Sequence, residues 1–122
     1  MKKLISIVVP MYNEHEMVDI FFARIKKVIA DNPNYNFEVV AVNDGSKDNT
    51  LELLKGHKET CSFLSIVSLS RNFGHEPAVA AGLSKAKGDA VIVMDCDMQD
   101  PPEVIIVFPC ITSAVARVSI IC

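Results

Sequence analysis

The sequence lacks the features that several common classes of protein need. Its net charge is −3, and its longest basic cluster is the pair Lys26-Lys27, which reads as part of a solvated helix face. The broad basic surface of a nucleic-acid-binding protein is therefore not expected. No G-x-G-x-x-G turn follows the first apolar run, where residues 10–13 read PMYN instead. This absence argues against a dinucleotide-dependent oxidoreductase.

Metal-binding cysteine clusters and a long apolar run near the N-terminus are also missing. No C-x-x-C pair occurs among the four cysteines, and the three histidines are scattered. This spacing is not that of a zinc site, and a reduced, cytoplasmic setting is the simplest interpretation. The apolar run of residues 4–9 is too short for a signal-peptide core or a membrane span. We therefore expect neither of them there.

The sequence does contain a regular alternation of short apolar runs and amphipathic stretches. Of the 122 residues, 50% are hydrophobic and 22% are charged, which suffices for the core of one domain. The expected strands are residues 4–9, 37–42, 63–69 and 90–94, and the expected helices are residues 14–30, 50–57 and 77–86. This order predicts an α/β fold, with an open, mainly parallel sheet and helices on both faces.

Local signals mark two of the helix ends. Asn13 is expected to cap the N-terminus of the first helix, with Glu16 as its capping-box partner. Lys87-Gly88 is expected to close the helix of residues 77–86. Both expectations concern backbone groups that find no partner within their own helix.

Polar residues gather in the loops that follow the expected strands. In a parallel sheet these loops meet on one rim, at the carboxyl ends of the strands, where ligands bind. The rim residues are Tyr12, Asn13 and Glu14; Asn43, Asp44 and Ser46; Arg71, Asn72 and His75; and Asp95, Asp97, Gln99 and Asp100. Each loop alone also has a structural explanation, since Asn13 can cap a helix and Asp44-Gly45 can form a turn. The concentration of polar residues on all four loops favours a site.

The triplet Asp95-Cys96-Asp97 is the most informative of these segments. Residues two apart at a strand end point to the same side, and two carboxylates placed in this way repel each other unless a cation lies between them. Mg²⁺ and Mn²⁺ prefer oxygen ligands, and Mg²⁺ often combines one or two carboxylates with phosphate oxygens. We therefore predict that Asp95 and Asp97 bind such a metal beside a diphosphate. Residues 99–103 are equally well explained as a helix start capped by Asp100.

Two other loops offer groups for a nucleotide. Asp44 can accept hydrogen bonds from a ribose or a base edge, although a plain turn accounts for residues 43–46 equally well. Arg71 can pair with phosphate oxygens. His75 precedes a helix, and the preferred interpretation is an ordinary surface residue.

Four segments together resemble glycosyltransferase family 2, whose GT-A fold has a Rossmann-like nucleotide-sugar-binding half. They are VVPMYNE (8–14), VNDGSKDNT (42–50), SRNFGHEPAVAAG (70–82) and GDAVIVMDCDMQDPPEVI (88–105). The resemblance covers residues 4–105, in order and at natural spacing, and is strongest to the polyprenyl-phosphate glycosyltransferases. Four ordered motifs are far more specific than any one of them.

The resemblance implies site residues in every rim loop. The implied donor-binding residues are Pro10, Tyr12, Glu14, Asp44, Arg71, Asn72, Asp95 and Gln99, and the implied ligands of Mg²⁺ or Mn²⁺ are Asp95 and Asp97. Within this set, Pro10, Tyr12 and Glu14 would line the nucleotide pocket and Asp44 would contact the uridine or guanosine. Arg71 and Asn72 would lie near the donor diphosphate, and Gln99 close to the donor sugar and phosphates.

The implied reaction transfers a hexose from a nucleotide-sugar, of the UDP-glucose or GDP-mannose type, to a polyprenyl phosphate at a membrane surface. A phosphate acceptor needs little deprotonation, so positioning and the metal matter more than a general base, and no catalytic residue is assigned. The protein would be cytoplasmic, or peripheral at the cytoplasmic face of the membrane, where full-length relatives are often anchored. The alternative is a module that binds the nucleotide-sugar without transferring it.

The C-terminal segment departs from the family pattern. The resemblance stops near Ile105, and residues 104–122 contain a single charged residue, Arg117. We expect residues 1–105 to form a partial donor-binding domain, and residues 106–122 an atypical, aggregation-prone apolar tail. Pro109 and Arg117 argue against a membrane anchor. A truncation or a shifted reading frame would explain the departure, and little transfer by this chain alone is expected.

Overall fold

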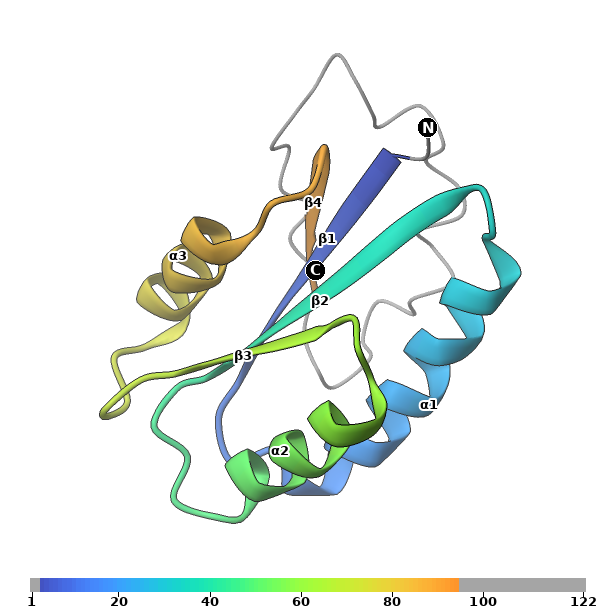
Figure 1. The fold of residues 1–122 in the computed structure, drawn as a ribbon. Coiled ribbons are helices and arrows are strands. Elements are labelled where there is room, and N and C mark those ends of the chain that lie inside the picture. The colour runs from blue at the N-terminus through green and yellow to red at the C-terminus, as the bar shows by residue number, and fades with distance from the viewer. Residues whose placement is uncertain (1–2, 95–122) are drawn as a thin grey trace.

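The computed structural model describes residues 3–94, which form one parallel sheet with helices on both faces (Figure 1). The strands are β1 (Lys3–Met11), β2 (Tyr35–Asn43), β3 (Leu64–Ser68) and β4 (Ala90–Val93), and the helices are α1 (His15–Asp31), α2 (Thr50–Thr60) and α3 (His75–Lys85). Within these residues the strand order is β3-β2-β1-β4, and each neighbouring pair is parallel. The predicted α/β, Rossmann-like fold is confirmed. In this part of the chain, no helix is long and apolar enough to cross a bilayer.

Two apolar layers hold the helices against the sheet. On one face, α1 and α2 cover β1 and β2, and Val9 and Phe22 lie in the same buried cluster. On the other face, α3 packs its Ala78 with Val8 and Val42. Successive residues of β1 thus enter opposite layers, and residues 5–9 are all buried. Burial on both faces explains why this strand reads as a continuous apolar run.

The strand register brings the carboxyl ends of the strands to one edge. Met11 of β1 pairs with Asn43 of β2, and Asn43 pairs with Ser68 of β3. At the other side of β1, the backbone N–H of Met94 donates to the carbonyl of Val8 at 3.1 Å. The loops that follow β1, β2 and β3 therefore share a rim, as the sequence predicted, and the predicted fourth loop, after β4, lies outside the described residues.

The predicted cap of α1 is wrong. The helix begins at His15, Glu14 stands at the N-cap, and no side chain makes a cap hydrogen bond. Asn13 has a positive φ of 52°, and its side-chain oxygen accepts a hydrogen bond from the backbone of Lys47 at 2.8 Å. The capping box with Glu16 does not form, because the β2–α2 loop supplies the partners that a local cap would supply.

The end of α3 also differs from the expectation. The helix stops at Lys85, and the extended residue Ala86 follows at its C-cap. Gly88 does not act as a left-handed C-cap, because the described glycines with positive φ are Gly45 and Gly74. Its lack of a side chain serves another purpose, since an added Cβ would lie 2.5 Å from the Ser6 hydroxyl.

Gly82 allows α3 to lie close to the sheet. A Cβ at this position would lie 2.4 Å from Cγ1 of Val8 and 2.9 Å from Cγ2 of Val42. We expect Gly82→Ala to lower the free energy of unfolding by about 1–3 kcal/mol, as overpacking of a core usually does. Denaturant unfolding followed by circular dichroism measures the difference.

Gly56 provides the matched control, because it also lies inside a helix, α2, but an added Cβ would meet nothing within 4 Å. Gly56→Ala is expected to raise the free energy of unfolding by up to about 1 kcal/mol through helix propensity. A Gly82→Ala variant as stable as Gly56→Ala would contradict the close packing of α3.

Candidate functional site

The described part of the rim consists of three loops. They are the β1–α1 loop (residues 12–14), the β2–α2 loop (residues 44–49) and the β3–α3 loop (residues 69–74). The predicted donor-binding residues in or beside them are Pro10, Tyr12, Glu14, Asp44, Arg71 and Asn72. Asp95, Asp97 and Gln99, which the sequence assigned to the metal and the donor, lie outside the described residues.

Asp44 joins the β2–α2 loop to the β3–α3 loop. It is buried, with 4% of its surface exposed. One carboxylate oxygen accepts the N–H of Phe73 at 2.8 Å, and the other accepts the N–H of Gly74 at 3.1 Å and the side-chain amide of Asn72 at 3.2 Å. A carboxylate has about four acceptor positions, so most of this capacity holds the β3–α3 loop.

Gly45 lets the same two loops touch. Its φ is +69°, and an added Cβ would lie 2.2 Å from the carbonyl carbon of Arg71 and 2.4 Å from the nitrogen of Asn72. Backbone atoms cannot move away as the end of a side chain can. The β2–α2 loop therefore contacts the β3–α3 loop through main-chain atoms, and the two loops behave as one structural unit.

The β3–α3 loop carries a cation on the rim. The guanidinium of Arg71 lies 4.1 Å from the centroid of the Phe73 ring, a cation–π contact that orients a long side chain. Both residues are exposed, Phe73 to 43%. Arg71 and Asn72 thus share a loop that Asp44 fixes, and the guanidinium is accessible to an anionic ligand.

The β1–α1 loop presents two of the predicted donor-binding side chains. Tyr12 is 40% exposed, and Glu14 and Pro10 are partly buried beside it. The ring of Tyr12 is one of the few large apolar surfaces left open among the described residues. An exposed aromatic ring at a sheet rim suits the stacking of a base.

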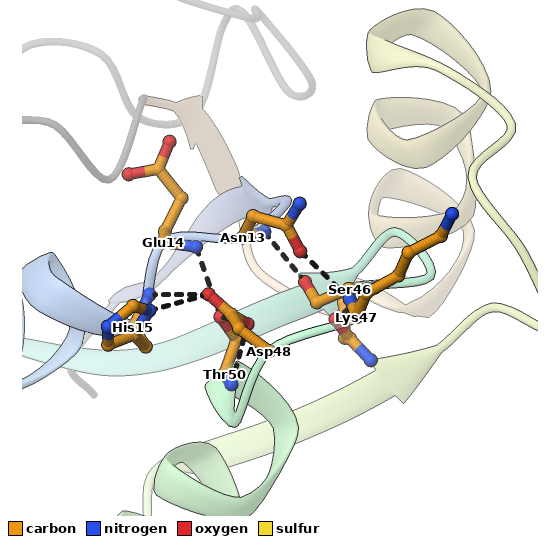
Figure 2. Close-up of polar contacts among 8 residues, drawn as sticks. Asn13, Glu14, His15, Ser46, Lys47, Asp48 and Thr50 are labelled. Atoms are coloured by element: carbon orange, nitrogen blue, oxygen red, sulfur yellow. Dashed lines mark hydrogen bonds and ion pairs between the residues drawn. The ribbon is translucent and has the colours of Figure 1, made fainter.

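Three consecutive backbone N–H groups, at the end of this loop and the start of α1, are held by side chains of residues 46–50 (Figure 2). Asn13 donates to the hydroxyl of Ser46 at 2.9 Å, Glu14 to the hydroxyl of Thr50 at 3.0 Å, and His15 to the carboxylate of Asp48 at 3.4 Å. These groups belong to the start of α1, where backbone donors lack partners within the helix. The neighbouring loop therefore satisfies them.

The start of α1 is consequently an unsuitable phosphate site. A helix N-terminus attracts anions through its open N–H groups and its dipole. Here the carboxylate of Asp48 already lies at the first helical residue, His15. A diphosphate at this position would face like charge, which agrees with the absence of the glycine-rich dinucleotide turn.

The carboxyl group of Asp48 is held in its ionised form. Partial burial acts to raise its pKa, but hydrogen bonds from the Thr50 hydroxyl, the His15 ring and the backbone N–H groups of both residues outweigh this effect. Together they lower the pKa of Asp48 from 3.8 to about 2. The charge that faces α1 is thus present at any physiological pH.

Asp48 and Thr50 were missed by the sequence reasoning as residues that join two loops. A signal existed, because an Asp two residues before the first helical residue of α2 is typical of a helix start. That signal predicts the local hydrogen bond from the Thr50 N–H to Asp48, observed at 2.9 Å. It does not predict the contacts to His15 and Glu14, which lie more than 30 residues away in sequence.

The predicted metal ligands are not among the described residues. Within residues 3–94, no group of three or more His, Cys, Asp or Glu side chains is placed to hold a metal ion. Two carboxylates of the described rim, Asp44 and Asp48, hold loops. The metal prediction therefore rests on Asp95 and Asp97, which directly follow β4 in the sequence.

Comparisons with known proteins agree with this arrangement. The family model described as Glycosyl transferase family 2 matches residues 6–108. The chain is 46% identical over 101 residues to the uncharacterized glycosyltransferase YkcC of Bacillus subtilis (strain 168). The aligned region covers 83% of this chain and 31% of that protein. The chain is 45% identical over 101 residues to the bactoprenol glucosyl transferase of Shigella phage SfV, with coverage of 83% and 33%. The chain thus spans about a third of the length of these relatives.

Solved structures share the fold. The mannosyltransferase PcManGT from Pyrobaculum calidifontis, in complex with GDP-Man and Mn²⁺, aligns with a TM-score of 0.74 at 24% identity, over 87% of this chain and 31% of that chain. TarS of S. aureus, in complex with UDP-GlcNAc, aligns with a TM-score of 0.67 at 30% identity, over 80% of this chain and 27% of that chain. Both likenesses support the fold that the sequence motifs implied.

Gly45→Ala tests whether the two loops form one unit. A non-glycine residue in the left-handed conformation costs about 1–2 kcal/mol, and the overlap with the Arg71 backbone adds to that cost. We expect the free energy of unfolding to fall by more than about 2 kcal/mol. Thermal unfolding beside Gly56→Ala measures it, and a Gly45→Ala variant with unchanged stability would show that the loops are not in contact.

Proposed function

Because this chain belongs to glycosyl transferase family 2, we propose that it is the donor-binding part of an enzyme that transfers a hexose from a nucleotide-sugar to a polyprenyl phosphate. The bactoprenol glucosyl transferases, about 45% identical over the matched region, support a polyprenyl-phosphate acceptor. The TarS complex with UDP-GlcNAc supports a nucleotide-sugar donor. The donor would be of the UDP-glucose or GDP-mannose type.

One observation carries the proposal. The three described rim loops are tied together by Asp44, Asp48 and Thr50, and they present Tyr12 and Arg71 on the edge at which β4 ends. An aromatic ring and a guanidinium on one hydrogen-bonded rim match the two parts of a nucleotide, its base and its diphosphate. The hydrogen bonds between the loops matter because a preformed site does not have to order its loops on binding.

Each described loop takes a part of the donor in this proposal. Pro10, Tyr12 and Glu14 line the nucleotide pocket, with Tyr12 against the base. Asp44 contacts the nucleoside with the acceptor capacity that its loop contacts leave. Arg71 and Asn72 lie beside the diphosphate.

The remaining groups come from the segment after β4. The two carboxylates of Asp95 and Asp97 are hard oxygen donors two residues apart, a set that fits Mg²⁺ or Mn²⁺. A divalent ion held by Asp95 and Asp97 would neutralise charge on the leaving diphosphate. Gln99 is assigned to the donor sugar and phosphates. The phosphate acceptor is ionised at neutral pH, so the chain has to position the two substrates rather than remove a proton.

The proposed acceptor is a lipid, which places the working enzyme at the cytoplasmic face of a membrane. The chain meets this surface as a peripheral domain in the proposal. The same rim would also serve a module that binds a nucleotide-sugar without transferring it. Binding and transfer are therefore measured separately.

Metal-dependent donor binding is expected to raise the melting temperature of the chain. A ligand at about 100 times its Kd stabilises the native state by about 2.7 kcal/mol. Thermal-shift titrations with UDP-glucose and GDP-mannose, with and without Mn²⁺, should show stabilisation by one nucleotide class, and only with the metal. Asp95→Ala and Asp97→Ala should abolish the shift, whereas the exposed α2 residue Glu59 offers a neutral control as Glu59→Ala. Equal shifts in all variants would refute the metal assignment.

A transfer assay separates the enzyme from the binding module. The chain is incubated with radiolabelled UDP-glucose or GDP-mannose, Mn²⁺ and polyprenyl phosphate in detergent, and lipid-linked label is counted. Little transfer is expected from the 122 residues alone. If the original chain forms labelled lipid and the Asp97→Ala variant does not, this chain carries out the full reaction.

A further inference from the structure

We propose that Asp48 and Thr50 are positioning residues for the donor site, which fix the β1–α1 loop in the shape that presents Tyr12 and Glu14. This inference rests on the proposed function, since it gives the two residues a role in donor binding. Neither residue is assigned a contact with the donor. They act through the backbone of the loop that does contact it.

Asp48 lies between the starts of two helices (Figure 2). One carboxylate oxygen accepts the backbone N–H of His15 at 3.4 Å and lies 2.7 Å from Nδ1 of its ring. The other oxygen accepts the N–H of Thr50 at 2.9 Å and its hydroxyl at 2.5 Å. His15 and Thr50 are the first residues of α1 and α2. One negative charge thus stabilises the positive ends of both helix dipoles.

The hydroxyl of Thr50 has its direction fixed by its partners. The backbone N–H of Glu14 can only donate, so the Thr50 oxygen accepts that hydrogen bond, at 3.0 Å. The single hydroxyl hydrogen then points to Asp48. Thr50 is fully buried, so water cannot replace either contact without a rearrangement. The position of the Glu14 backbone therefore depends on this hydroxyl and, through it, on Asp48.

The ring of His15 is fixed in the same way. An ionised carboxylate offers only acceptors, so Nδ1 of His15 must carry the hydrogen in the 2.7 Å contact. The ring is then either the Nδ1–H tautomer or the imidazolium. We call Asp48, Thr50 and His15 the clamp. The NMR signals of the His15 ring nitrogens report on the clamp separately from any change in the stability of the protein.

Residues of the β2–α2 loop also hold Asn13. No side-chain cap hydrogen bond forms at the start of α1, and Asn13 stands in the left-handed region with φ 52°, which asparagine adopts more readily than most non-glycine residues. Ser46 and Lys47 bind Asn13 from the same neighbouring loop. Residues 46–50 therefore support the backbone conformation next to Tyr12.

A matched pair of variants at one buried position tests the role. Thr50→Val keeps the shape of the side chain and removes the hydroxyl, whereas Thr50→Ser keeps the hydroxyl and removes a methyl group. Isothermal titration of each with UDP-glucose and with GDP-mannose, in the presence of Mn²⁺, measures the donor Kd. We expect about tenfold weaker binding for Thr50→Val, from the loss of one net hydrogen bond, and a Kd within about twofold of the original for Thr50→Ser.

The ¹⁵N NMR spectrum of His15 and the hydrogen exchange of the Glu14 amide report on the clamp itself. Thr50→Val should raise the exchange rate of the Glu14 amide, and Asp48→Asn should remove the preference for hydrogen on Nδ1 of His15. If Thr50→Val fails to fold, Asp48→Asn carries the test in its place, because Asp48 lies partly at the surface, with 21% of its side chain exposed. The same weakening of donor binding is expected for it.

The outcomes separate the two proposals. An unchanged chain that binds neither nucleotide-sugar overturns the proposed function and the positioning role together. An unchanged chain that binds one of them, with Thr50→Val and Asp48→Asn binding equally well, overturns the positioning role alone. Equal weakening by Thr50→Ser and Thr50→Val also overturns it, because the effect would then follow the packing of the side chain and not its hydroxyl.

Discussion

The described site depends on the hydrogen bonding of loop backbone N–H groups by side chains of the β2–α2 segment. Asp44 holds the β3–α3 loop, and Asp48, Thr50 and Ser46 hold the β1–α1 loop. Backbone donors near a buried sheet edge need partners, because an unsatisfied buried group costs about 1–3 kcal/mol. Residues 44–50 therefore act as the centre to which both neighbouring loops are attached.

This use of the β2–α2 segment changes where a diphosphate can bind. In dinucleotide-binding folds the phosphates bind at the N-terminus of the first helix. Here Asp48 occupies that position with a charge of the same sign as phosphate. The strand order is shared with dinucleotide-binding folds, but the proposed phosphate site differs. In this proposal a guanidinium on the β3–α3 loop and a metal bound after β4 would neutralise the phosphate charge.

The sequence predicted the fold well because its evidence is periodic and local. Buried apolar runs predicted β1 to β4, and the polar loops after β1, β2 and β3 correctly indicated a shared rim. It failed at Asn13, which looks like a cap but is held in a left-handed conformation by Lys47. It also missed the loop contacts of Asp44. Such contacts join residues about 30 positions apart, and no pattern within a short window records them. Asp95, Asp97 and Gln99 stay predictions.

The β2–α2 and β3–α3 loops contact each other at Gly45, and this contact limits which sequence changes the rim can accept. Because main-chain atoms of Arg71 and Asn72 fill the space where a Cβ would stand, an insertion in either loop would have to be matched in the other. Residues 44–46 and 71–74 would then be inherited as a single module. A new preference for the nucleotide base would arise more easily at an exposed residue such as Tyr12, which takes no part in this contact between the loops.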